Sequence, residues 1–168
     1  DLGPYFRREE DYFDRGVRCL AQELRGMLPE GPVLAAGLGN RAMTCDAVGP
    51  AAVDNLLVTR HMIRAMPRQF ADFRPVAAVC PGVLARTGME ALELVRGAVE
   101  RVRPAAVIAV AALAARDSAR LCATVQLSDT GLIPGSGVGN HRRAIDRRAL
   151  GVPVIAIGVP TVIDGAAL

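Results

Sequence analysis

The residues that could carry out chemistry gather in two glycine-rich segments. The first, GLGNRAMTCDAVGP at 37–50, holds one carboxylate, Asp46, where a buried strand is expected to give way to a helix. In that position an aspartate either caps the helix or acts in a site, as a base toward water or as a metal ligand. The second, SDTGLIPGSGVGN at 128–140, joins an Asp-Thr-Gly triplet to a run of glycines.

The second segment is similar to two known motifs but lacks features that each of them requires. Asp129, Thr130 and Gly131 match the triplet of pepsin-type proteases, but those enzymes are all-β and bring two such triplets together, whereas this chain contains one. A dinucleotide fingerprint needs a third glycine where Asn140 stands, and a Walker loop needs a lysine, which the chain lacks. The residues alone therefore indicate a glycine-rich turn that lets two backbones approach closely.

Peptide hydrolysis by carboxylates requires two acids that are close enough to share a proton. One acid then acts as a base toward water, while the other donates a proton to the carbonyl oxygen or to the leaving nitrogen. The end of the 105–113 segment is the natural place for a partner of Asp46, but the first acid beyond it is Asp117. His61 and His141 are isolated, and no cysteine pair or Cys/His cluster has the spacing of a zinc site.

The composition favours one domain built on a parallel sheet. A chain of 168 residues can bury a sizeable core, and this one is 51% hydrophobic but only 4% aromatic. Aliphatic strands of this kind are typical of sheets covered on both faces. The net charge of +3 is too small to indicate nucleic-acid binding, and we interpret the basic run at 141–148 as a solvated surface. No apolar run is long enough to cross a bilayer, and the unpaired cysteine spacing is typical of reduced cytosolic thiols.

Hydrophobic periodicity predicts alternating helices and strands. The predicted helices cover 6–28, 49–66 and 87–103, and the predicted strands cover 33–39, 75–82, 105–113, 123–129 and 152–160. This order predicts an α/β fold with a doubly wound, mostly parallel sheet and helices on both faces. Sites in such sheets form at the carboxyl ends of the strands, which selects the loops 39–49, 81–88, 111–120 and 129–140.

Several long segments of the chain resemble the germination protease family of spore-forming bacteria. They are GLGNRAMTCDAVGPAAVDNLLVTRHM, FRPVAAVCPGVLARTGMEALELVRGAV, SDTGLIPGSGVGNHR and LGVPVIAIGVPTVID, and the similarity covers about residues 33–164. The resemblance implies a fold like that of hydrogenase maturation proteases, and an endopeptidase that degrades small acid-soluble spore proteins at germination. It also implies a cytoplasmic location in the spore core, synthesis as a zymogen, assembly as a homotetramer and no cofactor.

The resemblance also assigns roles to individual residues. The family uses two aspartates, and the first falls on Asp46. The second belongs to a motif that here reads VAALAAR at 110–116, so Ala111 occupies its position. Loss of a general acid or base typically costs about 10²–10⁴ in rate, so we expect the chain as given to be inactive. The residues expected to line the cleft near the scissile peptide are Thr130, Gly131, Gly135 and Ser136.

Several alternatives stay open. Ala111 is either an introduced change that disables the site, or a natural variant in which activity is lost or relocated to Asp117 or Asp129. A maturation-type endopeptidase that senses a bound metal is one alternative function, and a non-catalytic binding protein on a protease fold is another. We expect one domain over 1–168 that is shorter at both ends than the family.

Overall fold

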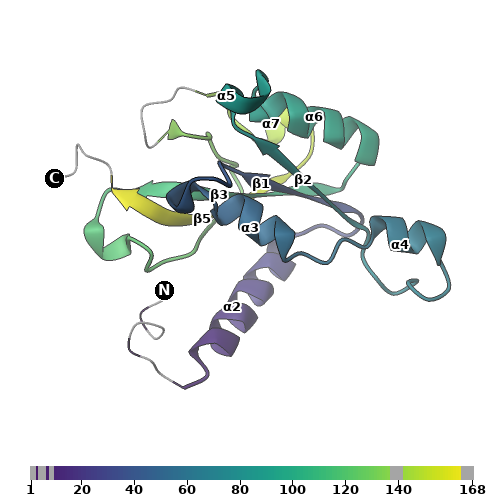
Figure 1. Cartoon of the computed structure of the whole chain (residues 1–168). Coiled ribbons are helices and arrows are strands. Elements are labelled where there is room, and N and C mark those ends of the chain that lie inside the picture. The colour runs from purple at the N-terminus through teal and green to yellow at the C-terminus, as the bar shows by residue number, and fades with distance from the viewer. Residues whose placement is uncertain (1–2, 4–6, 8–9, 137–141, 164–168) are drawn as a thin grey trace.

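The computed structural model describes residues 3, 7, 10–136 and 142–163 and contains a five-stranded sheet (Figure 1). The strands are β1 (Val33–Leu38), β2 (Val76–Gly82), β3 (Ala106–Ala115), β4 (Gln126–Ser128) and β5 (Val154–Ile163). Their order across the sheet is β2-β1-β3-β5-β4. All neighbours are parallel except β4, which runs antiparallel to β5.

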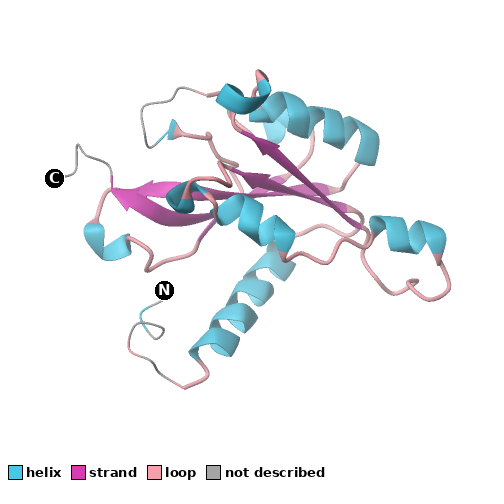
Figure 2. Cartoon of the chain, in the orientation of Figure 1, coloured by secondary structure: helices cyan, strands magenta, loops and turns pink. Residues whose placement is uncertain are grey.

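Helices cover both faces of this sheet, as Figure 2 shows. The α-helices are α2 (Tyr12–Met27), α3 (Val48–Asp54), α4 (Arg60–Ala65), α5 (Leu84–Thr87), α6 (Ala91–Val102) and α7 (Arg147–Leu150), and two short 3₁₀ helices are η1 (Thr44–Asp46) and η2 (Ser118–Arg120). α3 packs on one face, against β1 and β3, while α6 packs on the other, with α7 beside it. The predicted α/β fold with a mostly parallel sheet and helices on both faces is therefore confirmed.

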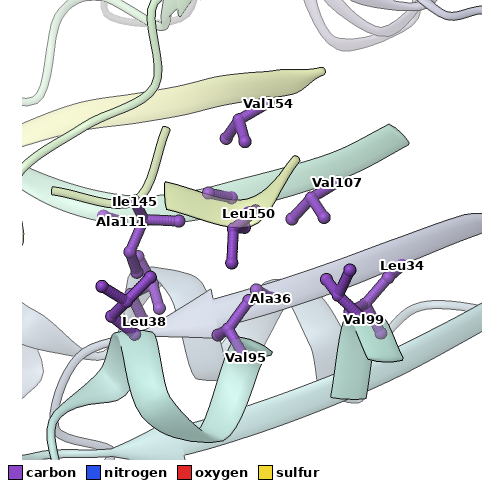
Figure 3. Close-up of a cluster of buried hydrophobic side chains, with 12 residues drawn as sticks. Leu34, Ala36, Leu38, Val95, Val99, Val107, Ala111, Ile145, Leu150 and Val154 are labelled. Carbon is purple, nitrogen blue, oxygen red and sulfur yellow. The ribbon is translucent and has the colours of Figure 1, made fainter. Parts of the chain in front are cut away.

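The hydrophobic core lies between the sheet and α6 (Figure 3). Alternate residues of the central strands point into it, because successive side chains of a strand face opposite sides. The buried cluster consists of Leu34, Ala36, Leu38, Leu92, Val95, Val99, Val107, Ala109, Ala111, Ile145, Leu150 and Val154. Small alanines on β1 and β2, Ala36 and Ala77, let α6 pack closely on these two strands. No helix in the described part of the chain is long and apolar enough to cross a lipid bilayer.

The helix predicted over 49–66 is wrong in its extent. α3 ends at Asp54 and α4 begins at Arg60, so two short helices replace one long helix. The break occurs because the buried residue Thr59 pairs with the start of β2 instead of continuing the helix. Its N–H donates to the carbonyl of Val76, and its hydroxyl accepts from the Val76 N–H and donates to the carbonyl of Arg74.

Other predicted elements differ mainly at their ends. The helix predicted over 87–103 begins at Ala91, after the separate short helix α5, and the helix predicted over 6–28 is described from Tyr12. Part of the latter prediction, at residues 6 and 8–9, lies outside the described residues. The strand predicted over 123–129 shrinks to β4, because the chain turns at Cys122, where φ is 53° and the N–H donates to the carbonyl of Pro160.

The closest approach between α3 and the sheet is made by two glycines. A Cβ placed on Gly49 would lie 2.3 Å from the carbonyl oxygens of Leu38 and Val110, so the start of α3 rests directly on the backbone of β1 and β3. A Cβ on Gly37 would lie 2.4 Å from the carbonyl oxygen of Gly49. Neither position has room for a side chain, and the neighbouring backbone cannot rotate away.

Replacing Gly49 tests this packing. We expect Gly49→Ala to lower the free energy of unfolding by about 3 kcal/mol or more, because backbone must shift to admit the methyl. Gly97→Ala on α6 is the matched control, since a Cβ there meets nothing within 4 Å. That substitution should raise stability by about 0.5–1 kcal/mol. Urea unfolding of both variants measures the difference, and equal effects would contradict the close contact.

Replacing Thr59 tests the connection between α4 and β2. Thr59→Val keeps the shape but leaves the N–H of Val76 without its acceptor, so we expect a loss of about 1–3 kcal/mol. Thr124→Val is the control, because the buried Oγ1 of Thr124 has no hydrogen-bond partner among the described residues. Its loss should be neutral or slightly stabilising in the same unfolding measurement. A Thr59→Val variant as stable as Thr124→Val would disprove the role of the hydroxyl.

Candidate functional site

The loop that carries Asp46 leaves β1 and closes on itself through the carboxylate. Oδ2 of the half-buried Asp46 accepts a hydrogen bond of 2.7 Å from the backbone N–H of Asn40. Gly39, with φ of 121°, makes this closure possible, since a Cβ there would lie 2.1 Å from the carbonyl oxygen of Asp46. The N-cap residue of α3 is Ala47, without a side-chain cap, so the interpretation of Asp46 as a helix cap is wrong.

The far end of this loop is fixed above the neighbouring strands. The hydroxyl of Thr161, on β5, donates a hydrogen bond to the carbonyl oxygen of Cys45, the residue before Asp46. η1 also lies close to β3. Asp46 is therefore held at the carboxyl end of the sheet, where the topology of an open α/β sheet places sites.

Ala111 reaches the same end of the sheet but faces the core. It lies one residue beyond the pair formed by Gly37 of β1 and Val110 of β3, and it pairs with Gly158 on β5. Its side chain is only 6% exposed and belongs to the cluster with Leu38 and Ile145, on the face covered by α6 (Figure 3). A carboxyl at this position would be largely removed from water, and such burial raises a carboxyl pKa.

A cavity of about 440 Å³ opens beside the end of β3. Three of the four residues predicted to line the cleft do line this cavity, namely Thr130, Gly131 and Ser136, whereas Gly135 does not. The other lining residues are Leu113, Leu132, Ile133, Ala144 and Asp146. The cavity therefore combines apolar walls with two hydroxyl groups and one carboxylate.

The shape of this cavity depends on two glycines. Gly131 has φ of 78°, and a Cβ there would lie 2.2 Å from the carbonyl oxygen of Ile145, so the 130–132 backbone packs directly on the 145–146 backbone. Gly158 leaves room for Leu113, since a Cβ at 158 would lie 2.2 Å from a terminal methyl carbon of that side chain. Leu113 thus folds over Gly158 to form one wall of the cavity.

Asp146 is a cavity residue that the sequence did not single out. Its Oδ1 accepts a hydrogen bond of 2.7 Å from the N–H of Ala149 and caps α7. The only signal in the sequence was an aspartate preceding RRAL, which is a helix-start pattern and points to no site. Asp117, one proposed substitute for the missing acid, caps η2 through Ala119, and Asp129, the other, is exposed.

A second cavity, of about 360 Å³, lies at the ends of β1 and β2. It begins where the Asp46 loop begins, and its lining includes the guanidinium-bearing residues Arg41 and Arg86. The remaining lining residues are Gly39, Asn40, Pro50, Cys80, Pro81, Gly82, Val83 and Thr87. The loops 39–49 and 81–88 are among those predicted to form sites, because they follow the carboxyl ends of strands. Nothing in the sequence distinguishes Arg41 and Arg86 from the other arginines.

Arg41 is tied to α3 by an ion pair with Asp54. The second contact of the pair joins Nη2 and Oδ1 at 2.8 Å. Hydrogen bonding to Asp54 raises the pKa of Arg41, and hydrogen bonding to Arg41 lowers the pKa of Asp54. Both side chains are exposed, so the pair orients the loop more than it stabilises the fold.

The described residues 10–136 and 142–163 contain no group of three His, Cys, Asp or Glu side chains arranged to hold a metal ion. His61 is exposed on α4. His141 and residues 137–140 of the glycine run lie outside the described residues.

The arrangement offers the carboxylate of Asp46, fixed at the end of the sheet, and a cavity on either half of that end, one of them lined by the carboxylate of Asp146. The carboxylate of Asp46 can accept a proton from water or share one with a second acid. The cavity beside β3 can take apolar groups and hydrogen-bond a peptide, and the cavity between β1 and β2 can take an anionic group. Neither Asp46 nor Ala111 is among the residues that line the two cavities.

Comparison with known proteins gives a consistent relationship over most of the chain. The family model for the germination protease matches residues 9–168. A germination protease of Priestia megaterium is 52% identical over 136 residues, covering 80% of this chain and 37% of that protein. Those of Caldanaerobacter subterraneus and of Bacillus cereus strain B4264 are 48% and 45% identical, each covering 96% of this chain and 51% and 44% of theirs.

The chain thus spans between about a third and a half of the length of these relatives. Among solved structures, a [NiFe] hydrogenase maturation protease, HycI from Thermococcus kodakarensis, is similar with a TM-score of 0.47. It is 14% identical, and the match covers 81% of this chain and 82% of that one. Because the family model matches nearly the whole chain and the relatives share about half of the aligned residues, the chain belongs to the germination protease family.

Proposed function

We propose that the protein is an endopeptidase, or the disabled form of one, that acts on small acid-soluble spore proteins during germination. The observation that carries this proposal is the position of Asp46, half-buried at the carboxyl end of the sheet and fixed by the N–H of Asn40. Membership of the germination protease family supports the reaction class. The spore core as location, zymogen activation and a homotetramer belong to the same proposal.

The proposed mechanism needs a second carboxylate near Asp46. In the active form, one acid of the pair removes a proton from water, which attacks the carbonyl carbon of the peptide. The other acid donates its proton to the carbonyl oxygen, which gives a gem-diol. The first acid then passes the proton that it took from water to the leaving nitrogen, and the gem-diol returns a proton to the second acid as the C–N bond breaks. The pair keeps one shared proton, because two carboxyl groups at short range cannot both be ionised.

Ala111 supplies a methyl group where this second acid is expected, so it can neither hold nor donate the shared proton. The buried position suits an acid that stays protonated, since desolvation disfavours the charged form. In the chain as given, Asp46 can still orient water. We therefore expect substrate binding in the cavities but cleavage slowed by about 10²–10⁴.

A binding role without catalysis is the second candidate function, and Ala111 is the observation that favours it. The cavities beside β3 and between β1 and β2 do not depend on a carboxylate at 111. Such a protein would bind small acid-soluble spore proteins and leave them intact. Calorimetric titration with an intact spore protein distinguishes a binder from a chain that neither binds nor cuts.

Restoring the acid tests the proposed mechanism. We expect Ala111→Asp to raise the rate of cleavage of a small acid-soluble spore protein by about 10²–10⁴, measured by mass spectrometry of the products. Ala112→Asp is the matched control, because it adds the same charge one residue further along β3, on the opposite face, and should not restore cleavage. Circular dichroism of both variants verifies that they are folded.

Two outcomes would contradict this assignment. If the unaltered chain cleaves as fast as Ala111→Asp, the second acid lies elsewhere, and Asp117, Asp129 and Asp146 become the next substitutions. If neither chain cleaves but both bind the spore protein, the non-catalytic function is the better account.

Replacing Asp46 in the Ala111→Asp background tests the first acid. We expect Asp46→Asn to lower cleavage by at least about a hundredfold, because the amide cannot take a proton from water. The fold should be preserved, since the amide oxygen can still accept from the N–H of Asn40. Asp129→Asn, at an exposed position, should leave the rate unchanged, and equal losses in the two variants would exclude a specific role for Asp46.

A further inference from the structure

The cavity at the ends of β1 and β2 is lined by an arginine, Arg86, whose guanidinium has no carboxylate partner among the described residues. Arg86 is exposed and lies on the short helix α5, so its side chain takes no part in the core. A guanidinium carries five N–H donors in a planar fork that matches the oxygens of an anion. A cationic side chain in this position is therefore available to a ligand.

A second guanidinium lines the same cavity and is held only by an exposed ion pair. Arg41 pairs with Asp54, and the two side chains are 57% and 45% exposed. Exposed ion pairs of this kind contribute little to stability, because water and salt screen them. An anion that binds more strongly than Asp54 can therefore draw Arg41 away from it and contact both guanidinium groups.

The carboxylate of Asp54 determines which anion gains most from the two arginines. A ligand with a single carboxylate would replace one carboxylate by another at Arg41 and would gain only the contact with Arg86. A phosphate monoester carries a charge of about −1.5 to −2 at pH 7 and three acceptor oxygens, so it can bind both forks at once. Competition with Asp54 thus favours phosphate over carboxylate.

The rest of the cavity has room for an organic group attached to the phosphate. Its volume of about 360 Å³ lies in the range of about 300–1,000 Å³ that is usual for small-molecule sites. Apolar surface is supplied by Pro50, Pro81 and Val83. We propose that this cavity binds a small phosphate monoester, with the phosphate between Arg41 and Arg86 and the organic group against the two prolines.

The proposed ligand would lie beside the loop that carries Asp46. Gly39 and Asn40 line the cavity, and the N–H of Asn40 also holds the carboxylate of Asp46, which is not a lining residue. The phosphate site therefore requires neither Asp46 nor an acid at 111, and it exists whether or not the protein cleaves peptides. Since the proposed function places part of the peptide in the same cavity, a bound phosphate ester would exclude that part of the substrate.

Calorimetric titration of the whole chain with phenyl phosphate, benzoate and phenol tests the class of ligand, because these probes share one ring and differ in charge. We expect phenyl phosphate to bind at least about tenfold more tightly than benzoate, since only the phosphate can contact both guanidinium groups. Phenol, which carries no charge near neutral pH, should give no measurable binding.

Substitutions test whether the phosphate binds between the two arginines. Arg41→Gln and Arg86→Gln should each weaken phenyl phosphate binding by about tenfold or more, because each removes a charged donor. Asp54→Asn should strengthen binding by about two- to fivefold, since Arg41 then loses its internal competitor. Arg148→Gln is the matched control, because Arg148 is exposed on α7 and does not line the cavity. Circular dichroism verifies that all four variants are folded.

The thiol of Cys80 reports on binding in this cavity directly, because Cys80 is exposed and is one of the lining residues. In a chain whose other cysteines, at 19, 45 and 122, are replaced by serine, saturating phenyl phosphate should slow the alkylation of Cys80 by iodoacetamide severalfold. Sodium chloride at the same ionic strength is the control and should leave the rate of alkylation unchanged.

Three results would overturn the proposal. The first is benzoate that binds as tightly as phenyl phosphate, which would assign the cavity to carboxylates such as the acidic side chains of a peptide. The second is an affinity for phenyl phosphate that Arg86→Gln and Arg148→Gln change equally, or that Asp54→Asn lowers. The third is a chain that shows no heat of binding and no protection of Cys80. A failure to cleave spore proteins would leave all of these measurements unaffected.

Discussion

The contact between Gly37 and Gly49 is the constraint on which the candidate site depends. Backbone meets backbone there, so the start of α3 is fixed relative to β1 and β3 with no side chain in between. Asp46 lies three residues before Gly49, in a loop too short to move independently of that contact. Pre-organisation of a carboxylate in this way reduces the reorganisation that a reaction needs, which is a large part of how enzymes use electrostatics.

Position 111, where we propose the second acid, would join the core to the candidate site. Ala111 belongs to the buried cluster under α6, and it lies in the middle of β3, level with the end of β1 that leads into the Asp46 loop. A methyl group suits the buried cluster, but it cannot act as the acid that the proposed mechanism needs. With alanine at 111, β3 is apolar along its whole length, at the position where the proposed mechanism would need a buried acid and would bear its cost.

The sequence predicted the central strands well because they are buried on both sides and read as aliphatic runs. It failed between Asp54 and Arg60, where the hydroxyl of Thr59 bonds to residues 15 and 17 positions later, a long-range contact that no local pattern reveals. Local pattern is equally uninformative about the residues that line the two cavities. Thr130, Gly131 and Ser136 were expected there from the family resemblance. Asp146 in the first cavity, and Arg41 and Arg86 in the second, are brought there by tertiary folding alone.

The glycines around the candidate site differ in whether a second substitution could make room for a side chain in their place. Gly158 is constrained by the flexible end of Leu113, so a lineage that first shortens residue 113 becomes free to place a side chain at 158 and to reshape the cavity wall. Gly49 is constrained by the carbonyl oxygens of two strands, and no substitution elsewhere can remove a carbonyl. Divergence among relatives should therefore be correlated at 113 and 158, with the cavity as the variable part, while position 49 remains outside the reach of compensating change.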